Sequence, residues 1–282
     1  MLKLSIITIN RNNKEGLQRT MESVLGGQTF DDFEYIVIDG ASDDGSVEVI
    51  ERYKDRLAYW CSESDRGIYH AMNKGIAQAK GDYLLFMNSG DCLVKGCLSK
   101  VFTQENDADF IYGTMVGCFH GNRLEYVPPH SSYKKLTFMQ FYMSSIGHQA
   151  TFIRRRLFDN CLYTENYRIV SDWEFFLKKI VLENCSTRYV DVIICEFDVT
   201  GISNDPQYKT IHGKERTEVL QRYIPQRILD DYVNFALLDD IQEDELLSAV
   251  LDIKATRTFK RFLIKVDLFL YRLYCLLRKR RT

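Results

Sequence analysis

Segments typical of buried β-strands alternate with segments typical of amphipathic helices through roughly the first ninety residues of the chain. The strand segments are compact apolar runs rich in β-branched residues, as expected of strands buried on both faces. We predict strands at residues 2–8, 33–38, 57–61 and 83–87, and helices at residues 14–25, 46–53 and 68–79. Strands and helices that alternate at this spacing form βαβ units with parallel strands. The sequence therefore predicts an α/β fold that begins with a parallel sheet.

The pattern changes in the second part of the chain. Residues 110–119 and 124–127 flank a turn-like segment at 120–123, which predicts a β-hairpin. Further extended segments are predicted at 149–153 and 188–199, helical ones at 136–142 and 173–182, and almost everything after about residue 208 favours helix. We expect the mixed strands to continue the first sheet. This gives one domain over residues 1–205 and a helical extension over residues 206–282.

Composition excludes several classes of protein. A net charge of −2 argues against general nucleic-acid binding. The eight cysteines have no zinc-binding spacing, so we expect reduced thiols in a cytoplasmic protein. The N-terminal apolar run is too short for a signal peptide, and no run of about 20 apolar residues could span a bilayer.

The final segment, residues 254–282, carries ten Lys and Arg side chains and one Asp, interleaved with many apolar side chains. A basic and apolar helix is typical of segments that bind a membrane surface or a protein partner. The alternative is a terminal helix packed on the domain with a solvated basic end. We favour binding to an anionic membrane surface, which would place the protein on the inner face of the cell membrane.

Four acidic residues follow strands or loops at the same predicted edge of the sheet: Asp39, Asp65, Asp91 and Asp172. Each has a structural explanation, because Asp stabilises turns and caps helices; Asp172 would cap a helix starting at Trp173. Together they favour a ligand site, since open α/β sheets bind ligands at the carboxyl ends of their strands. Such carboxylates can contact a ribose or base, hold Mg²⁺ or Mn²⁺, or remove a proton from a hydroxyl.

Other residues bear on the same question. Arg66 and Lys74 are candidates to contact phosphate oxygens, although each also fits a solvated helix face. His148 and His212 are isolated in the sequence, and we interpret them as ordinary polar residues. No Gly-rich phosphate loop and no Gly-x-Ser-x-Gly turn occurs, which argues against dehydrogenases, P-loop enzymes and serine hydrolases.

Several blocks in order along the chain resemble the inverting family-2 glycosyltransferases of the GT-A fold. They are SIITINRN, YIVIDGASDDGS, SESDRGIYHAMNKGI and GDYLLFMNSGD, followed by IGHQATFIRRRLF, YRIVSDWEFFLKK and FDVTGISN. The later blocks are similar to the subgroup that builds bacterial surface polysaccharides. The resemblance covers roughly residues 3–205. It implies a mixed, mostly parallel sheet flanked by helices and transfer of a sugar from a nucleotide-sugar donor, UDP-linked by expectation, to a saccharide or lipid-linked acceptor.

The resemblance also implies roles for individual residues. Asp172 would be the catalytic base, and Asp91 would bind Mg²⁺ or Mn²⁺. The donor would be bound by the remaining residues that match the blocks: Thr8, Asn10, Asp39, Asp65, Arg66, Asn73, Lys74 and Asn88.

One motif departs from the family pattern. The Asp-x-Asp metal motif is here Asn88-Ser-Gly-Asp91, so a single carboxylate remains. One carboxylate with water and two phosphate oxygens suffices for Mg²⁺. Two alternatives stay open: a non-catalytic protein that binds sugar nucleotides, suggested by the reduced motif, and a nucleotidyltransferase, disfavoured because the N-terminal segment NRNNKEG lacks a Gly-rich loop.

Overall fold

The computed structural model describes residues 2–102, 107–119, 121–124, 127, 134–233, 264–266 and 268–269. The chain divides into two compact units, Met1–Tyr223 and Ile224–Thr282. Helix α7 (Lys209–Tyr223) follows the predicted domain boundary at residue 205 and belongs to the first unit. The predicted basic tail lies outside the described residues, apart from residues 264–266 and 268–269, which are helical.

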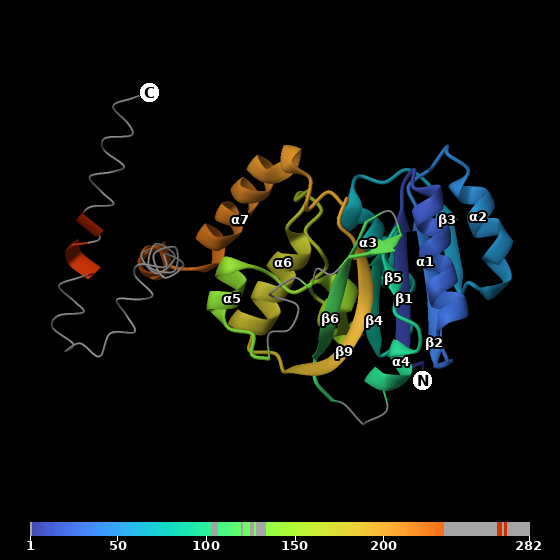
Figure 1. The fold of residues 1–282 in the computed structure, drawn as a ribbon, viewed down its shortest axis with the longest axis horizontal. Coiled ribbons are helices and arrows are strands. Elements are labelled where there is room, and N and C mark those ends of the chain that lie inside the picture. Colours follow the sequence, from blue (N-terminus) through green and yellow to red (C-terminus); the bar gives the residue numbers. More distant parts are fainter. Residues whose placement is uncertain are drawn as a thin grey trace. The chain divides into compact units, whose positions relative to one another are not determined.

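The first half of the sheet is parallel, as predicted. Its strands lie in the order β3-β2-β1-β4, with parallel pairing throughout. The strands are β1 (Leu4–Asn10), β2 (Phe33–Asp39), β3 (Tyr59–Ser62) and β4 (Tyr83–Asn88), and the helices that connect them are α1 (Lys14–Gly27), α2 (Ser46–Tyr53) and α3 (Ile68–Gln78). Figure 1 shows these helices on the two faces of the sheet. The carboxyl ends of β1, β2 and β4 therefore meet at one edge.

The second half continues the same sheet with mixed pairing. Strand β8 (Thr151–Arg154) runs antiparallel to β4 and to β6 (Phe110–Phe119), and β9 (Thr187–Asp198) runs parallel to β6. The edge strand β5 (Cys92–Leu93) pairs with β9. The remaining helices are α4 (Cys97–Val101), α5 (Phe138–Met143) and α6 (Ser171–Phe176), which continues as a π-helical turn over Leu177–Leu182.

The predicted hairpin exists, but its second strand begins earlier than predicted; residues 125–126 of the predicted strand lie outside the described residues. Strand β7 is Asn122–Arg123, and these residues pair with Phe119 and Cys118. The chain therefore turns back inside the segment that we assigned to the turn. Positive φ at Gly121 (82°) permits this tight reversal, because glycine has no Cβ to clash in that conformation.

Side chains alternate between the two faces of the sheet and build a core on each. In β4, Leu84 and Phe86 pack on the side covered by α3 and α6, whereas Leu85 and Met87 pack on the side covered by α1, α2 and α4. All four are fully buried. Covering both faces explains the continuous apolar runs in the sequence, because each residue of such a strand faces a core.

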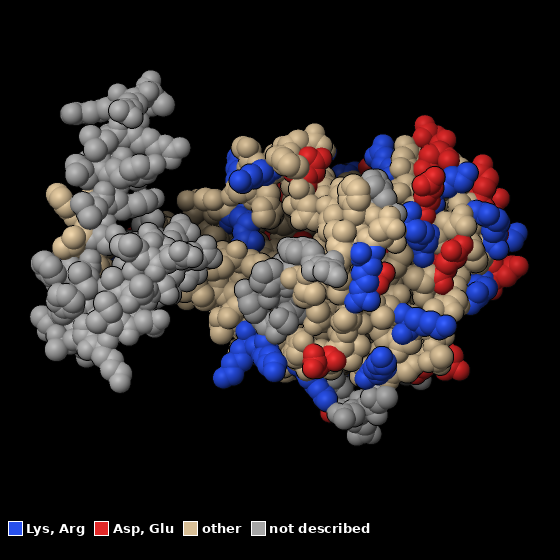
Figure 2. Space-filling model, viewed as in Figure 1, with Lys and Arg blue, Asp and Glu red and all other residues tan. Residues whose placement is uncertain are grey.

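The surface of the first unit carries charges of both signs. Figure 2 shows Lys and Arg interspersed with Asp and Glu over α1 and α2. None of the helices among the described residues is long and apolar enough to cross a membrane.

Candidate active site

The ends of β1 and β2 hold a buried polar cluster around Asp39. The Asp39 carboxylate is fully buried and accepts hydrogen bonds from Asn10 Nδ2 (2.7 Å), from the Ser42 backbone N–H and hydroxyl (2.9 and 2.6 Å), and from the Ser62 hydroxyl (2.6 Å). Burial alone would raise the pKa of Asp39, but these hydrogen bonds outweigh it and hold the pKa below its ordinary value. Asp39 is therefore an ionised carboxylate at neutral pH.

Thr8 lies deeper on β1. Its hydroxyl is fully buried and lies 2.9 Å from the hydroxyl of Tyr35. Burial raises the pKa of Tyr35, so this phenol stays neutral.

The residues predicted around the ribose and diphosphate contact one another and the loop before α6. Lys74 Nζ lies 2.6 Å from Asp65 and 2.8 Å from Glu63, and Arg66 pairs with Glu165 at 2.5 Å. Asp65 Oδ1 also lies 3.0 Å from His70 Nδ1. In this conformation Arg66 and Lys74, the two residues predicted to contact phosphate, are both paired with carboxylates of the protein.

Asn73 is a structural link in the same region. Its Nδ2 donates to the Tyr163 carbonyl at 2.9 Å, and the Tyr163 N–H donates back to Asn73 Oδ1 at 3.1 Å. The side chain thus ties α3 to the segment that leads into α6.

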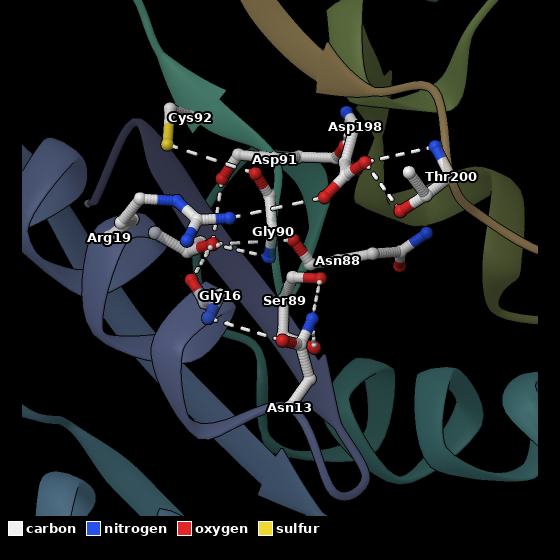
Figure 3. A network of polar contacts seen from close by, with 11 residues as sticks. Asn13, Gly16, Arg19, Asn88, Ser89, Gly90, Asp91, Cys92, Asp198 and Thr200 are labelled. Atoms are coloured by element: carbon white, nitrogen blue, oxygen red, sulfur yellow. Dashed lines mark hydrogen bonds and ion pairs between the residues drawn. The ribbon is translucent and has the colours of Figure 1, made fainter. Parts of the chain in front are cut away.

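The segment after β4 is held rigidly between α1 and β9 (Figure 3). The Thr20 hydroxyl donates to the Asp91 carbonyl at 2.7 Å, and Asn13 Nδ2 donates to the Ser89 carbonyl at 2.9 Å. Gly90 has a φ of +110°, and a Cβ at this position would lie 3.1 Å from Asp198 Oδ2. Glycine fits here for both reasons.

Asp91 is only 4% exposed, and its Oδ1 accepts a hydrogen bond from the Asp198 N–H at 2.8 Å. Burial raises the pKa of Asp91 to about 6. The Asp198 carboxylate accepts from the N–H and hydroxyl of Thr200 and lies 3.9 Å from Arg19 (Figure 3). Two carboxylates thus lie at the end of β4, where the sequence predicted one.

This donor set fits a divalent cation. Hard cations prefer carboxylate oxygens, and Asp91 faces the same pocket as Asp198. Within the part of the chain that the structure describes, no group of three or more His, Cys, Asp or Glu side chains could hold a metal ion. Further ligands would have to come from water or from a bound substrate.

Asp172 lies in the first turn of α6, which begins at Ser171 after Val170. The prediction that Asp172 caps a helix starting at Trp173 is therefore wrong. Asp172 Oδ1 accepts from the Tyr69 hydroxyl at 2.9 Å, and Oδ2 lies 2.8 Å from His148 Nδ1. Burial would raise the pKa of Asp172, but the bonds from His148 and Tyr69 prevail and lower it. The carboxylate is therefore ionised and able to accept a proton.

His148 is not isolated in the structure. It lies in a 3₁₀ turn, His148–Ala150, and its Nε2 is 3.1 Å from Asn88 Nδ2. The ring therefore joins Asn88, at the end of β4, to Asp172. The interpretation of His148 as an ordinary polar residue missed this link, because neither partner is near it in the sequence.

These groups share one pocket of about 480 Å³, a size typical of small-molecule sites. Three of the predicted site residues line it, namely Asn88, Asp91 and Asp172. The other predicted residues are not part of its lining: Thr8, Asn10, Asp39, Asp65, Arg66, Asn73 and Lys74.

The pocket also contains Arg216 from α7, which the sequence analysis did not single out. Its guanidinium lies 4.2 Å from the ring of Trp173 and donates to the Phe141 and Tyr142 carbonyls at 2.7 and 3.0 Å. Burial lowers the pKa of Arg216 to about 10, so the side chain remains cationic. It fixes the end of α5 beside the pocket.

Comparisons with known proteins agree with this arrangement. The family model for Glycosyl transferase family 2 matches residues 5–162. An uncharacterised glycosyltransferase of Mycobacterium tuberculosis is 32% identical over 219 residues, which cover 76% of this chain and 81% of that protein. A poly(ribitol-phosphate) beta-N-acetylglucosaminyltransferase of Staphylococcus aureus is 34% identical over 120 residues, 40% of this chain and 36% of that protein.

A solved mannosyltransferase from Pyrobaculum calidifontis, in complex with GDP-Man and Mn²⁺, has a similar fold. Its TM-score is 0.61 at 13% identity, with 98% of this chain and 82% of that chain covered. The expected GT-A architecture is thereby confirmed. From the family match, the relatives and the fold, the chain belongs to the family-2 glycosyltransferases and is a glycosyltransferase.

Proposed function

We propose that this enzyme transfers a sugar from a nucleoside-diphosphate donor, UDP-linked by preference, to a saccharide or lipid-linked acceptor with inversion at the anomeric carbon. The observation that carries the proposal is Asp172: an ionised carboxylate, 16% exposed, in the same pocket as Asn88 and Asp91. A single base facing the end of β4 suits one direct displacement.

In this mechanism Asp172 accepts the proton of the acceptor hydroxyl as that oxygen bonds to the anomeric carbon. The bond between that carbon and the nucleoside diphosphate breaks on the opposite face, so the configuration inverts. The bonds from Tyr69 and His148 hold both carboxylate oxygens, each of which keeps a lone pair for the incoming hydroxyl. Positioning of this kind lowers the entropic cost of reaching the transition state.

The leaving group is the nucleoside diphosphate. Asp91 would hold Mg²⁺ or Mn²⁺, and a bound cation would neutralise the charge that develops on the diphosphate. The Mn²⁺ in the mannosyltransferase of the same fold supports this assignment. Asn88, which lines the same pocket, would donate the second N–H of its amide to a phosphate oxygen.

The nucleoside end is assigned to the ends of β1 and β2. Asn10 and Asp39 present the polar groups there, with Thr8 beneath them. Arg66 and Lys74 would contact the diphosphate after exchanging their present carboxylate partners, and Asp65 and Asn73 would border the ribose.

The proposal for the acceptor depends on one relative of the chain and on its basic C-terminal segment, residues 254–282. The partial match to a poly(ribitol-phosphate) N-acetylglucosaminyltransferase supports a role in making surface polysaccharide. The ten basic side chains of residues 254–282 support peripheral binding to anionic lipid, where a lipid-linked acceptor would be found. Co-sedimentation with anionic liposomes tests this: equal binding by the full chain and by a chain truncated before residue 254 would refute it.

The reaction itself is tested by donor hydrolysis. UDP-, GDP- and TDP-sugars are incubated with Mn²⁺ or Mg²⁺ and then with EDTA, and release of the nucleotide is measured. We expect release from one donor, lost on chelation. Asp172→Asn should bind the nucleotide with unchanged affinity and lose turnover; inertness of the native enzyme to every donor would favour the non-catalytic alternative.

A further inference from the structure

His148 contacts both Asp172, the proposed base for the acceptor hydroxyl, and Asn88, which the proposed function places at the departing diphosphate. Its Nδ1 lies 2.8 Å from Asp172 Oδ2, and its Nε2 lies 3.1 Å from Asn88 Nδ2. The His148 side chain is 13% exposed and that of Asp172 16% exposed, so water competes little for either contact. One imidazole ring thus connects the end of β4 to the first turn of α6.

The direction of the bond to Asp172 follows from the chemistry of the partners. An ionised carboxylate only accepts, so the Nδ1–H of His148 donates a hydrogen bond to Asp172. The side-chain amide of Asn88 lies at the other ring nitrogen, Nε2. An amide carries both a donor and an acceptor, so it can pair with Nε2 whether or not that nitrogen carries a proton.

The ring also holds Asn88. The amide atom of Asn88 that does not contact the ring, Oδ1, is buried and has no hydrogen-bond partner among the residues that the structure describes. Buried acceptors are almost always paired, so an unpaired one on a pocket wall needs an explanation. A bound substrate that presents a donor would satisfy it.

We propose that His148 is a positioning residue for the transfer reaction: it orients the carboxylate of Asp172 and, through the same ring, the amide of Asn88. The proposal rests on the assignment of Asp172 as the base. The second anchor of the carboxylate, the Tyr69 hydroxyl, also contacts the Ile169 carbonyl at 2.5 Å, and its single proton cannot serve both acceptors fully. Of the two side-chain donors, His148 and Tyr69, only His148 is wholly committed to Asp172, which also accepts from the Trp173 backbone N–H.

Two substitutions at the same position separate the two bonds. His148→Asn places an amide nitrogen near the position of Nδ1, so it can keep the bond to Asp172 and lose the bond to Asn88. His148→Gln places the amide near Nε2 and does the reverse. The pair is matched in polarity, and His148→Ala removes both bonds.

The activity assay uses UDP-GlcNAc and GDP-mannose as donors, water as acceptor, and release of the nucleotide as readout. We expect His148→Gln to lower kcat by about 10²-fold with little change in donor KM, the loss typical of a misplaced catalytic group. His148→Asn should retain most of kcat and raise the donor KM, because Asn88 loses its bond to the ring, and His148→Ala should do both. Equal losses in the Asn and Gln variants, or no loss in any of the three, would overturn the proposal.

A pH profile separates positioning from general damage to the fold. The groups whose interaction with Asp172 must be considered are Tyr69 from α3, Tyr163 before α6, His148, and His212 from α7. His148 lowers the pKa of Asp172, so losing its bond raises that pKa. The acid limb of kcat should move to higher pH in the Gln variant and move less in the Asn variant, which keeps the hydrogen bond.

A measurement without substrate covers the case in which neither donor turns over. Long-range ¹H–¹⁵N NMR spectra of the native chain report the tautomer of each histidine, and His148→Asn identifies the relevant signals by their absence. A proton on Nδ1 supports the proposal, and a ring protonated on Nε2 alone overturns it. If Asp172→Asn keeps full turnover, the base assignment fails, which is distinct from failure at His148 alone.

Discussion

Replacing Asn73 tests whether this side chain serves the fold or the substrate. Asn73 is 8% exposed and Tyr163 3% exposed, and the two exchange a pair of hydrogen bonds of 2.9 and 3.1 Å. Asn73→Ala leaves the N–H and C=O of Tyr163 buried without partners. Each unsatisfied group costs about 1–3 kcal/mol, so we expect a loss of about 3 kcal/mol in the free energy of unfolding.

Asn73→Asp should also destabilise, for a different reason. The carboxylate can still accept from the Tyr163 N–H, but it cannot donate to the Tyr163 carbonyl, and it would face Glu165 Oε1, now 3.3 Å from Nδ2. Like charges at this distance repel. Gln78→Ala, an exposed position at the end of the same helix, is the matched control and should change stability by less than about 0.5 kcal/mol.

The assay is urea unfolding followed by tryptophan fluorescence, with donor KM measured in parallel. A stability within about 0.5 kcal/mol of the native value for Asn73→Ala would refute the structural account. If KM for UDP-GlcNAc rises while stability is unchanged, Asn73 contacts the donor, as the family resemblance implies.

Three further changes test the pocket. Tyr69→Phe removes a donor to Asp172, so the pKa of Asp172 should rise and the acid limb of the kcat profile should move to higher pH; an unmoved limb contradicts the assignment. Gly90→Ala forces a Cβ against Asp198 at a φ of +110° and should cost about 1–2 kcal/mol in thermal or urea unfolding, more than Gly26→Ala, where nothing lies within 4 Å. Asp91→Asn should weaken Mn²⁺ binding in the presence of UDP at least tenfold by electron paramagnetic resonance, roughly the loss of one charged ligand, and equal affinity would remove Asp91 from the metal site.

The parallel half of the fold could be predicted because its information is local. Strands β1, β2 and β4 are mostly apolar runs that are buried on both faces, so their length and composition identified them. The errors occurred where contacts between distant parts of the chain determine the structure. Strand β7 is set by pairing with Phe119 and Cys118, which no local pattern specifies.

Part of the site could be predicted because some of its information is also local. Strand ends are visible in the sequence, so Asn88 and Asp91 could be located, and the family blocks pointed to Asp172. His148 could not be recognised, because it lies 24 residues from Asp172 and 60 from Asn88, and single histidines are common. Asp198 is the last residue of β9, but the predicted extended segment ran to residue 199, so the rule that selected Asp91 did not select it.

The reduced metal motif has a consequence when Asn88 and His148 are considered together. An ionised Asp at position 88 would only accept, so it could pair with Nε2 only when that nitrogen carries a proton. The Asn88 amide has both a donor and an acceptor, so it can pair with Nε2 in either state of the ring while Nδ1 stays bonded to Asp172. The amide therefore does more than replace a lost carboxylate: it keeps the ring that orients the proposed base in place.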